Sequence, residues 1–150
     1  MLVVGDKAPE ITAHNQKGKE IKLSDYLGKK IILYFYPKDD TPTCTVQSCN
    51  LRDNYTALKA AGYQVLGVSA DDVKSHAKFA KKFKLPFPLF ADVAHKAVND
   101  YGVWGEKTNF GHTYMGIIRT TFVIDEKGYI AHIINKVDSD GHTAQILGLK

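Results

Sequence analysis

The chain has 150 residues, 44% of them hydrophobic, and a net charge of +4, a composition that suits one globular domain with a sizeable core. Two Cys residues are far too few for a small secreted disulfide scaffold, and a domain of this length folds without a metal or disulfide. The longest apolar run, at residues 31–36, is much shorter than the roughly 20 residues of a membrane-spanning helix, so we expect no membrane segment.

The N-terminal sequence MLVVGDKAPE reaches Asp6 and Lys7 before an apolar stretch of useful length for a secretion signal has formed. This pattern favours a cytoplasmic protein. Residues 11–24 follow with weaker β patterning, and we expect a short pair of strands or loops there.

The run IILYFY at residues 31–36 is continuously apolar and rich in β-forming residues, and YQVLGVSA at 63–70 repeats this character. A polar, periodic segment between them predicts one helix over 43–60, with Gly62 as its stop. Its apolar positions near one face are Val46, Leu51, Tyr55, Leu58 and Ala61. The unit is therefore a strand, helix and parallel strand with a right-handed crossover.

Further along the chain, the pattern predicts a helix near 72–83, a short strand at 88–91, a helix near 94–101 and a hairpin within 120–135. No repeat or linker interrupts this order, so we expect a single domain over residues 1–150. The fold class is α/β, with a central mixed sheet flanked by helices. Sheets of this kind place active sites beyond the carboxyl ends of their strands.

Five lysines crowd the helix predicted near 72–83, above Phe79 and Phe83 at helical spacing; they are Lys74, Lys78, Lys81, Lys82 and Lys84. The simplest interpretation is a solvated face over an apolar stripe. The charge alone also permits nucleic-acid binding, but the chain carries no recognised binding motif, and we expect no nucleic-acid partner.

Cys44 follows the first buried strand by eight residues and opens a helix, so it should lie in the first turn. Backbone N–H groups have no intrahelical partner there and favour an anion, which for a cysteine is the reactive thiolate. Asp39 and Asp40 oppose a thiolate by like charge, and we expect both to point to solvent. A structural role as a small buried hydrophobe stays open for both cysteines at this stage.

Cys49 lies five positions beyond Cys44 on the same predicted helix. Ideal helix geometry separates the two Cα atoms by about 8.7 Å and turns the side chains about 140° apart. A disulfide needs less than about 7 Å, so the pair can close only if the helix unwinds locally. Four-ligand zinc binding is disfavoured because the six His residues show no paired spacing, and the C-x-x-C pair of thioredoxin-type exchange is absent.

Pro37, Thr41 and Cys44 spell P-x-x-x-T-x-x-C, which resembles the active-site motif of peroxiredoxins, and Arg119 in GIIRTTFVID stands where that family keeps its arginine. The segments CTVQSCNLRDNY, GYQVLGVSAD, YGVWGEK and HTAQILGLK extend the resemblance, over nearly the whole chain, to the bacterioferritin comigratory protein or peroxiredoxin Q subfamily. The resemblance implies a thioredoxin-like fold. Thr43 departs from the Gly that usually precedes the reactive cysteine, and a β-branched residue resists positive φ.

The resemblance implies a thiol-dependent peroxidase that reduces hydrogen peroxide and organic hydroperoxides. Cys44 would become a sulfenic acid, and Cys49 would resolve it as an intramolecular disulfide. Arg119 would supply positive charge, the Thr41 hydroxyl would contact peroxide and sulfur, and Pro37 would shield the thiolate from water. A thioredoxin-type dithiol protein would recycle the enzyme, which would be a monomer without cofactor or metal.

Other interpretations stay open for single residues and for the whole protein. Arg119 alone could be a surface strand residue, Thr41 a helix cap and Pro37 a strand terminator. We expect Trp104, Tyr34 and Tyr36 to belong to the core or to a pocket wall rather than to the chemistry. The alternative function is a redox-responsive binding or signalling protein that uses the Cys44–Cys49 disulfide as a conformational switch.

Overall fold

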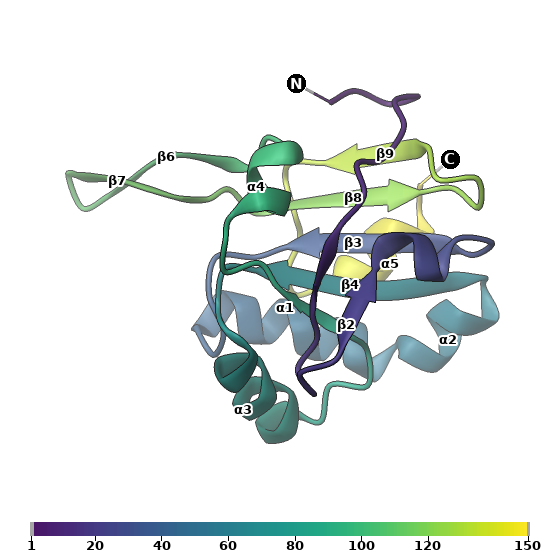
Figure 1. Cartoon of the computed structure of the whole chain (residues 1–150), viewed down its shortest axis with the longest axis horizontal. Helices are drawn as coiled ribbons and strands as arrows, with labels where there is room; N and C mark the ends of the chain where they lie inside the picture. The colour runs from purple at the N-terminus through teal and green to yellow at the C-terminus, as the bar shows by residue number, and fades with distance from the viewer. Residues whose placement is uncertain (1, 150) are drawn as a thin grey trace.

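The computed structural model describes residues 2–149 apart from the Asn109 side chain, so the predicted domain of residues 1–150 extends one residue beyond it at each end. Seven strands form one sheet in the order β2-β1-β5-β4-β3-β8-β9, and β6 and β7 form a separate hairpin that projects from the body (Figure 1). The strands of the main sheet are β1 (Thr12–His14), β2 (Glu20–Lys22), β3 (Lys30–Phe35), β4 (Tyr63–Ser69), β5 (Leu89–Ala91), β8 (Thr120–Ile124) and β9 (Ile130–Ile134). The hairpin strands are β6 (Trp104–Asn109) and β7 (His112–Ile117).

The sheet is mixed, as predicted. β3 pairs with β4 in parallel and β4 with β5 in parallel, whereas β8 pairs antiparallel with both β3 and β9. The predicted parallel unit and the hairpin around Glu126 are therefore confirmed, and the short pair predicted in residues 11–24 is β1 with β2. The sequence patterns missed the β6–β7 hairpin, because most of β7 is exposed and neither strand has the apolar alternation of a core strand.

The helices are η1 (Leu23–Tyr26, a 3-10 turn), α1 (Pro42–Asp53), α2 (Tyr55–Ala60), α3 (Val73–Phe83), α4 (Lys96–Asp100) and α5 (His142–Leu147). The prediction of one continuous helix over 43–60 is wrong, because Asn54 leaves helical geometry with φ −109° and ψ 10° and separates α1 from α2. Val46, predicted on the apolar face, is 44% exposed, while Leu51 and Leu58 are buried. Neither sequence periodicity nor composition marked α5 as a helix. None of the helices described is long and apolar enough to cross a bilayer.

Two apolar layers cover the two faces of the sheet, and β3 contributes to both by alternation. Ile31, Leu33 and Phe35 face one layer, to which α4 contributes Ala97 and Val98. Ile32 and Tyr34 face the other layer, to which α1, α2, α3 and α5 contribute Leu51, Leu58, Phe79 and Ile146. Among the helices on this second face, α1 and α3 lie beside the carboxyl end of β3.

Candidate active site

A short loop carries the chain from the end of β3 into α1, at the sheet edge where active sites of α/β proteins are expected. Thr41 is the N-cap residue and Pro42 occupies the first helical turn, where a missing N–H costs nothing. Cys44 is the third residue of α1 and is only 1% exposed. Thr43, which replaces the usual Gly before the reactive cysteine, is helical and has no positive φ, so its β-branched side chain causes no backbone strain there.

Arg119 brings a positive charge directly to the Cys44 sulfur. It lies between β7 and β8, is half-buried, and its Nη2 donates to Cys44 Sγ at 3.0 Å. Its Nη1 donates to Gln47 Oε1 at 2.5 Å. The guanidinium fork therefore holds two side chains of one face of α1 at once, which rules out the interpretation of Arg119 as an unattached surface residue.

Gln47 was not singled out from the sequence, although it lies three residues after Cys44 and so on the same helix face. Its side chain is fully buried, and its carbonyl oxygen fixes the Arg119 guanidinium. The amide nitrogen of Gln47 has no hydrogen-bond partner among the described residues. The helical spacing of three was the available signal for this residue.

Thr41 and Pro37 lie in the same loop as the predicted motif requires. The Thr41 hydroxyl donates to the Lys38 carbonyl oxygen at 3.0 Å and makes no helix-capping hydrogen bond. Its hydrogen is thus engaged within the loop, while its oxygen retains lone pairs that can accept a hydrogen bond. Pro37 is half-buried and directly follows the fully buried Tyr36. The shielding role of Pro37 stays a prediction.

Cys49 is free and partly exposed on the intact α1, and Cys44 is free as well. Partial burial raises the pKa of the Cys49 thiol, and Arg52 opposes this shift to a smaller extent. The thiol at position 49 is therefore more accessible than the thiol at position 44, and its burial disfavours its own thiolate. With α1 continuous through both positions, the helix geometry keeps the two sulfurs on different faces.

Tyr34 of β3 and Tyr36, which directly follows this strand, form the wall behind α1, as expected for aromatic residues. Tyr34 and Tyr36 are fully buried in the apolar layer that includes Cys44, and their rings stack at 5.3 Å. The Tyr34 hydroxyl is 2.9 Å from the Ser48 hydroxyl of α1. Trp104 is partly buried at the base of the hairpin, and its ring lies 4.6 Å from that of His95.

The prediction that both loop aspartates point to solvent is wrong for Asp39. Its carboxylate is buried and accepts hydrogen bonds from the Tyr36 hydroxyl at 2.6 Å, the Ser75 hydroxyl at 2.8 Å and His76 Nδ1 at 2.7 Å. Three donors compensate the loss of hydration, which the sequence alone did not reveal. Asp40 is exposed as predicted and forms an ion pair with Lys82 at 2.8 Å.

His76 carries the charge that balances Asp39. Its second ring nitrogen, Nε2, lies 2.9 Å from the Phe90 carbonyl oxygen, so both ring nitrogens face acceptors. Burial alone lowers the pKa of His76, but the hydrogen bond and charge of Asp39 outweigh it and raise that pKa above its usual value. The protonated ring therefore fits this site, and it fastens the loop before α1 to α3.

Ligand atoms of Asp39, Asp71 and His76 lie within 4.8 Å of one another, a spacing compatible with a metal site. Each is already used within the protein, because His76 pairs with Asp39 while Asp71 accepts from the Asp39 backbone N–H at 2.8 Å and from the Ser69 hydroxyl at 2.6 Å. This hydrogen-bond network accounts for the cluster without an ion.

Comparison with known proteins places these features in a family. The model of the AhpC/TSA family matches residues 4–133. Peroxiredoxin Bcp of Bacillus subtilis is 44% identical over 146 residues, which cover 97% of this chain and 93% of that protein. Peroxiredoxin Bcp of Escherichia coli is 43% identical over 97% of this chain and 94% of its own length. The solved structure of the Xanthomonas campestris bacterioferritin comigratory protein, studied for alkyl peroxide reduction, has a TM-score of 0.85 at 32% identity, covering 91% of this chain and 87% of that one.

Proposed function

The chain belongs to the AhpC/TSA family and, within it, to the Bcp or peroxiredoxin Q peroxiredoxins. From this premise we propose that Cys44 reduces hydroperoxides and that Cys49 is its resolving partner. Family membership supports a peroxidase with a thioredoxin-like fold. The observation that carries the assignment of Cys44 is the Arg119 guanidinium at 3.0 Å from its sulfur.

The first step is attack of the Cys44 thiolate on one oxygen of the O–O bond. The S–O bond forms as the O–O bond breaks, the peroxide is reduced by two electrons, and the other oxygen leaves with negative charge and takes up a proton to give water or an alcohol. Arg119 stabilises the thiolate before attack, and its fixed positive charge also stabilises the developing charge on the departing oxygen. Gln47 maintains the guanidinium in this position.

Two further groups support the same step. The Thr41 oxygen, whose hydrogen is engaged by Lys38, can accept a hydrogen bond from the hydroperoxide O–H. Pro37 has no N–H to donate and fills the loop after β3, where it limits access of water to the sulfur. Near-complete burial of Cys44 agrees with a dry site that strengthens the charge interactions.

The second step resolves the Cys44 sulfenic acid. The Cys49 sulfur attacks the Cys44 sulfur, a disulfide forms, and the sulfenic oxygen leaves as water. Because α1 holds the two sulfurs apart, its first turns must unwind for this step. A thioredoxin-type dithiol protein then returns both cysteines to the thiol state. The monomeric state and the cytoplasmic location stay predictions.

The test combines kinetics with mass spectrometry. Reduced protein is mixed with stoichiometric hydrogen peroxide while the fluorescence of Trp104, the single Trp, is followed, and the products are mapped. We expect a rapid phase that ends in a Cys44–Cys49 disulfide.

The variant Cys49→Ala should retain the first turnover but accumulate sulfinic acid at Cys44 under repeated peroxide. The matched control Cys44→Ala should show no rapid phase. A Cys49→Ala protein that cycles normally with a dithiol would refute the resolving role, and slow oxidation of both thiols in the native protein would favour structural cysteines.

A further inference from the structure

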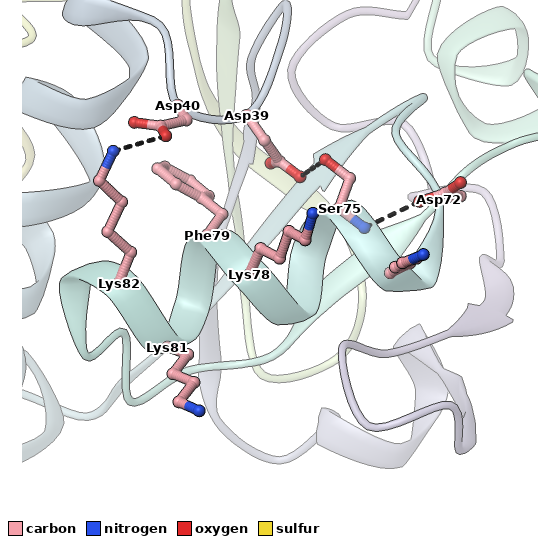
Figure 2. A pocket seen from close by; sticks show the side chains of 9 residues that line it. Asp39, Asp40, Asp72, Ser75, Lys78, Phe79, Lys81 and Lys82 are labelled. Carbon is pink, nitrogen blue, oxygen red and sulfur yellow. Dashed lines mark hydrogen bonds and ion pairs between the residues drawn. The ribbon is translucent and has the colours of Figure 1, made fainter.

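One face of α3 gathers uncompensated positive charge beside the reactive helix. Four of its eleven residues are exposed lysines, none is acidic, and Lys84 follows as the C-cap. We call the set Lys74, Lys78, Lys81 and Lys82 the lysine face. These residues line a hollow of about 880 Å³ that also reaches the loop before α1 (Figure 2).

The three carboxylates in this hollow do not neutralise the lysine face. Asp39 is buried and occupied by His76, Asp72 caps α3 by accepting from the Ser75 N–H at 2.8 Å, and Asp40 pairs with Lys82 alone. Lys74, Lys78 and Lys81 form no ion pair with any described residue. Figure 2 shows Lys78 and Lys81 extending from the helix with no interaction drawn to another lining residue. A net positive field therefore projects from α3.

The position of α3 connects this field to the cysteines. Lys82 reaches Asp40 just before α1, and Arg52 near the end of α1 donates to the Phe83 carbonyl oxygen of α3 at 2.8 Å. The C-terminal end of α3 thus contacts the loop before α1 and the last turn of α1, and α1 carries both cysteines. Cys49 is the more exposed of the two, so an approaching protein can reach its sulfur from outside.

We propose that the lysine face of α3 docks the protein that reduces the oxidised enzyme, a dithiol reductant with an acidic surface around its reactive thiol. This inference rests on the proposed function. The occupant follows from charge complementarity, since a patch of this sign attracts a negatively charged partner and speeds its encounter. The patch spans one helix of about 16 Å, with Asp40 and Asp72 along its border, which would repel a continuous phosphate backbone.

The chemistry that docking serves is thiol–disulfide exchange. The thiolate of the reductant attacks Cys49 Sγ, a mixed disulfide forms, and the Cys44–Cys49 bond breaks to release Cys44 as a thiolate. The second thiol of the reductant then attacks the reductant's first sulfur, which is bonded to Cys49, and releases Cys49 as a thiol. Two electrons pass to the enzyme, and the reductant ends as a disulfide.

The test compares a protein reductant with a small one. For each variant, kcat/KM is measured for a bacterial thioredoxin kept reduced by NADPH and thioredoxin reductase, and the recycling rate is measured with dithiothreitol. The double variant Lys78→Glu/Lys81→Glu should lower the ratio of thioredoxin to dithiothreitol rates about tenfold at low salt. The neutral pair Lys78→Gln/Lys81→Gln should lower it about threefold, which separates loss of attraction from new repulsion.

The matched control is Lys29→Glu/Lys127→Glu. Both lysines are exposed, unpaired among the described residues and located at the opposite end of β3, and the charge change is identical. This control should keep the native ratio. In the native protein, raising salt from about 20 to about 200 mM should lower the thioredoxin kcat/KM and leave the dithiothreitol rate unchanged.

If the α3 and control variants gave equal ratios, the docking surface would be overturned. Turnover with dithiothreitol in the same variants would still support the peroxidase. Absence of turnover even with dithiothreitol would overturn both. Salt-dependent retention on immobilised DNA that is lost in the α3 variants, together with an unchanged ratio, would reassign the lysine face to nucleic acid and also overturn the proposal.

Discussion

The loop that precedes α1 and the first turns of α1 are neighbours in the chain but are held in opposite ways. Asp39 in the loop is buried and accepts three side-chain hydrogen bonds, one of them from His76. α1 begins without a side-chain cap, has no acidic residue in its first turn and is interrupted at Asn54. The loop is fixed by a buried carboxylate, whereas the first turn of α1 has no side-chain cap and is held by the contacts of Cys44 and Gln47 with Arg119.

This difference suits a site that must hold two arrangements. In the proposed mechanism, peroxide reduction needs α1 folded, with Arg119 bound to both Cys44 and Gln47, whereas disulfide formation needs the same turns unwound. In this mechanism the Asp39 anchor would let α1 melt without releasing the loop, so that Pro37 and Thr41 would stay in place for refolding. We infer that the boundary between the fixed and the melting segment lies near Thr41.

Removal of Asp39 should break the fixed side of the comparison. In Asp39→Ala the buried Tyr36 hydroxyl, Ser75 hydroxyl and His76 ring lose their shared acceptor, and the free energy of unfolding should fall by about 3–5 kcal/mol. Urea denaturation at mildly acidic pH measures the loss. Asp40→Ala, which breaks only the exposed pair with Lys82, should cost less than about 1 kcal/mol. Equal losses in the two variants would contradict the anchor.

Removal of the Arg119 charge should impair the reactive arrangement of Cys44 in the folded α1. Arg119→Gln should slow the oxidation of Cys44 by hydrogen peroxide by about 10²–10³-fold, as for the loss of one charge-stabilising donor. Stopped-flow Trp104 fluorescence measures the rate. The control is Arg52→Gln near the other end of α1, which should change the oxidation rate less than twofold. An equal loss of rate in Arg52→Gln and Arg119→Gln would contradict the role of Arg119.

Titration of His76 should weaken the anchor without a mutation. Because its folded pKa is raised, its stabilising contribution is complete below its unfolded pKa of about 6.5 and is lost as the pH rises through the folded value. We expect the urea midpoint to decline as the pH rises above about 6.5. The groups near the ring are the Asp39 and Asp71 carboxylates, the Phe90 carbonyl oxygen and the Tyr36 ring. In His76→Gln this decline should disappear, and a decline of unchanged size would refute its origin in His76.

A matched pair of substitutions at Val46 should have the smallest effect, a change in the stability of α1 and so in the rate of disulfide closure. Val46 is 44% exposed on α1, so Val46→Ala and Val46→Gly act mainly through helix propensity, which separates them by about 1 kcal/mol. Disulfide closure should be about fivefold faster in the Gly variant than in the Ala variant, as measured by rapid acid quench and mass spectrometry. Identical closure rates would show that α1 does not unwind before the disulfide forms.

The sequence predicted the mixed sheet, the parallel unit and the residues around Cys44 because each depends on local periodicity or motif spacing. It missed the break at Asn54, since no Gly or Pro marks it, and it missed the β6–β7 hairpin, whose side chains are largely exposed. Asp39 was misjudged because its partners Ser75 and His76 lie 36 and 37 residues away. Gln47 was within reach of the helical spacing, but only the structure shows which group it holds.

Amide hydrogen exchange on the reduced and disulfide forms tests the central claim most directly. In the reduced protein the amides of residues 45–50 should be protected by α1, and in the Cys44–Cys49 disulfide form they should exchange rapidly. The amides of α3 and of Asp39, whose N–H donates to Asp71, should stay protected in both forms. A disulfide form that keeps α1 fully protected, or loses protection equally in α3, would contradict a melting helix next to a fixed loop.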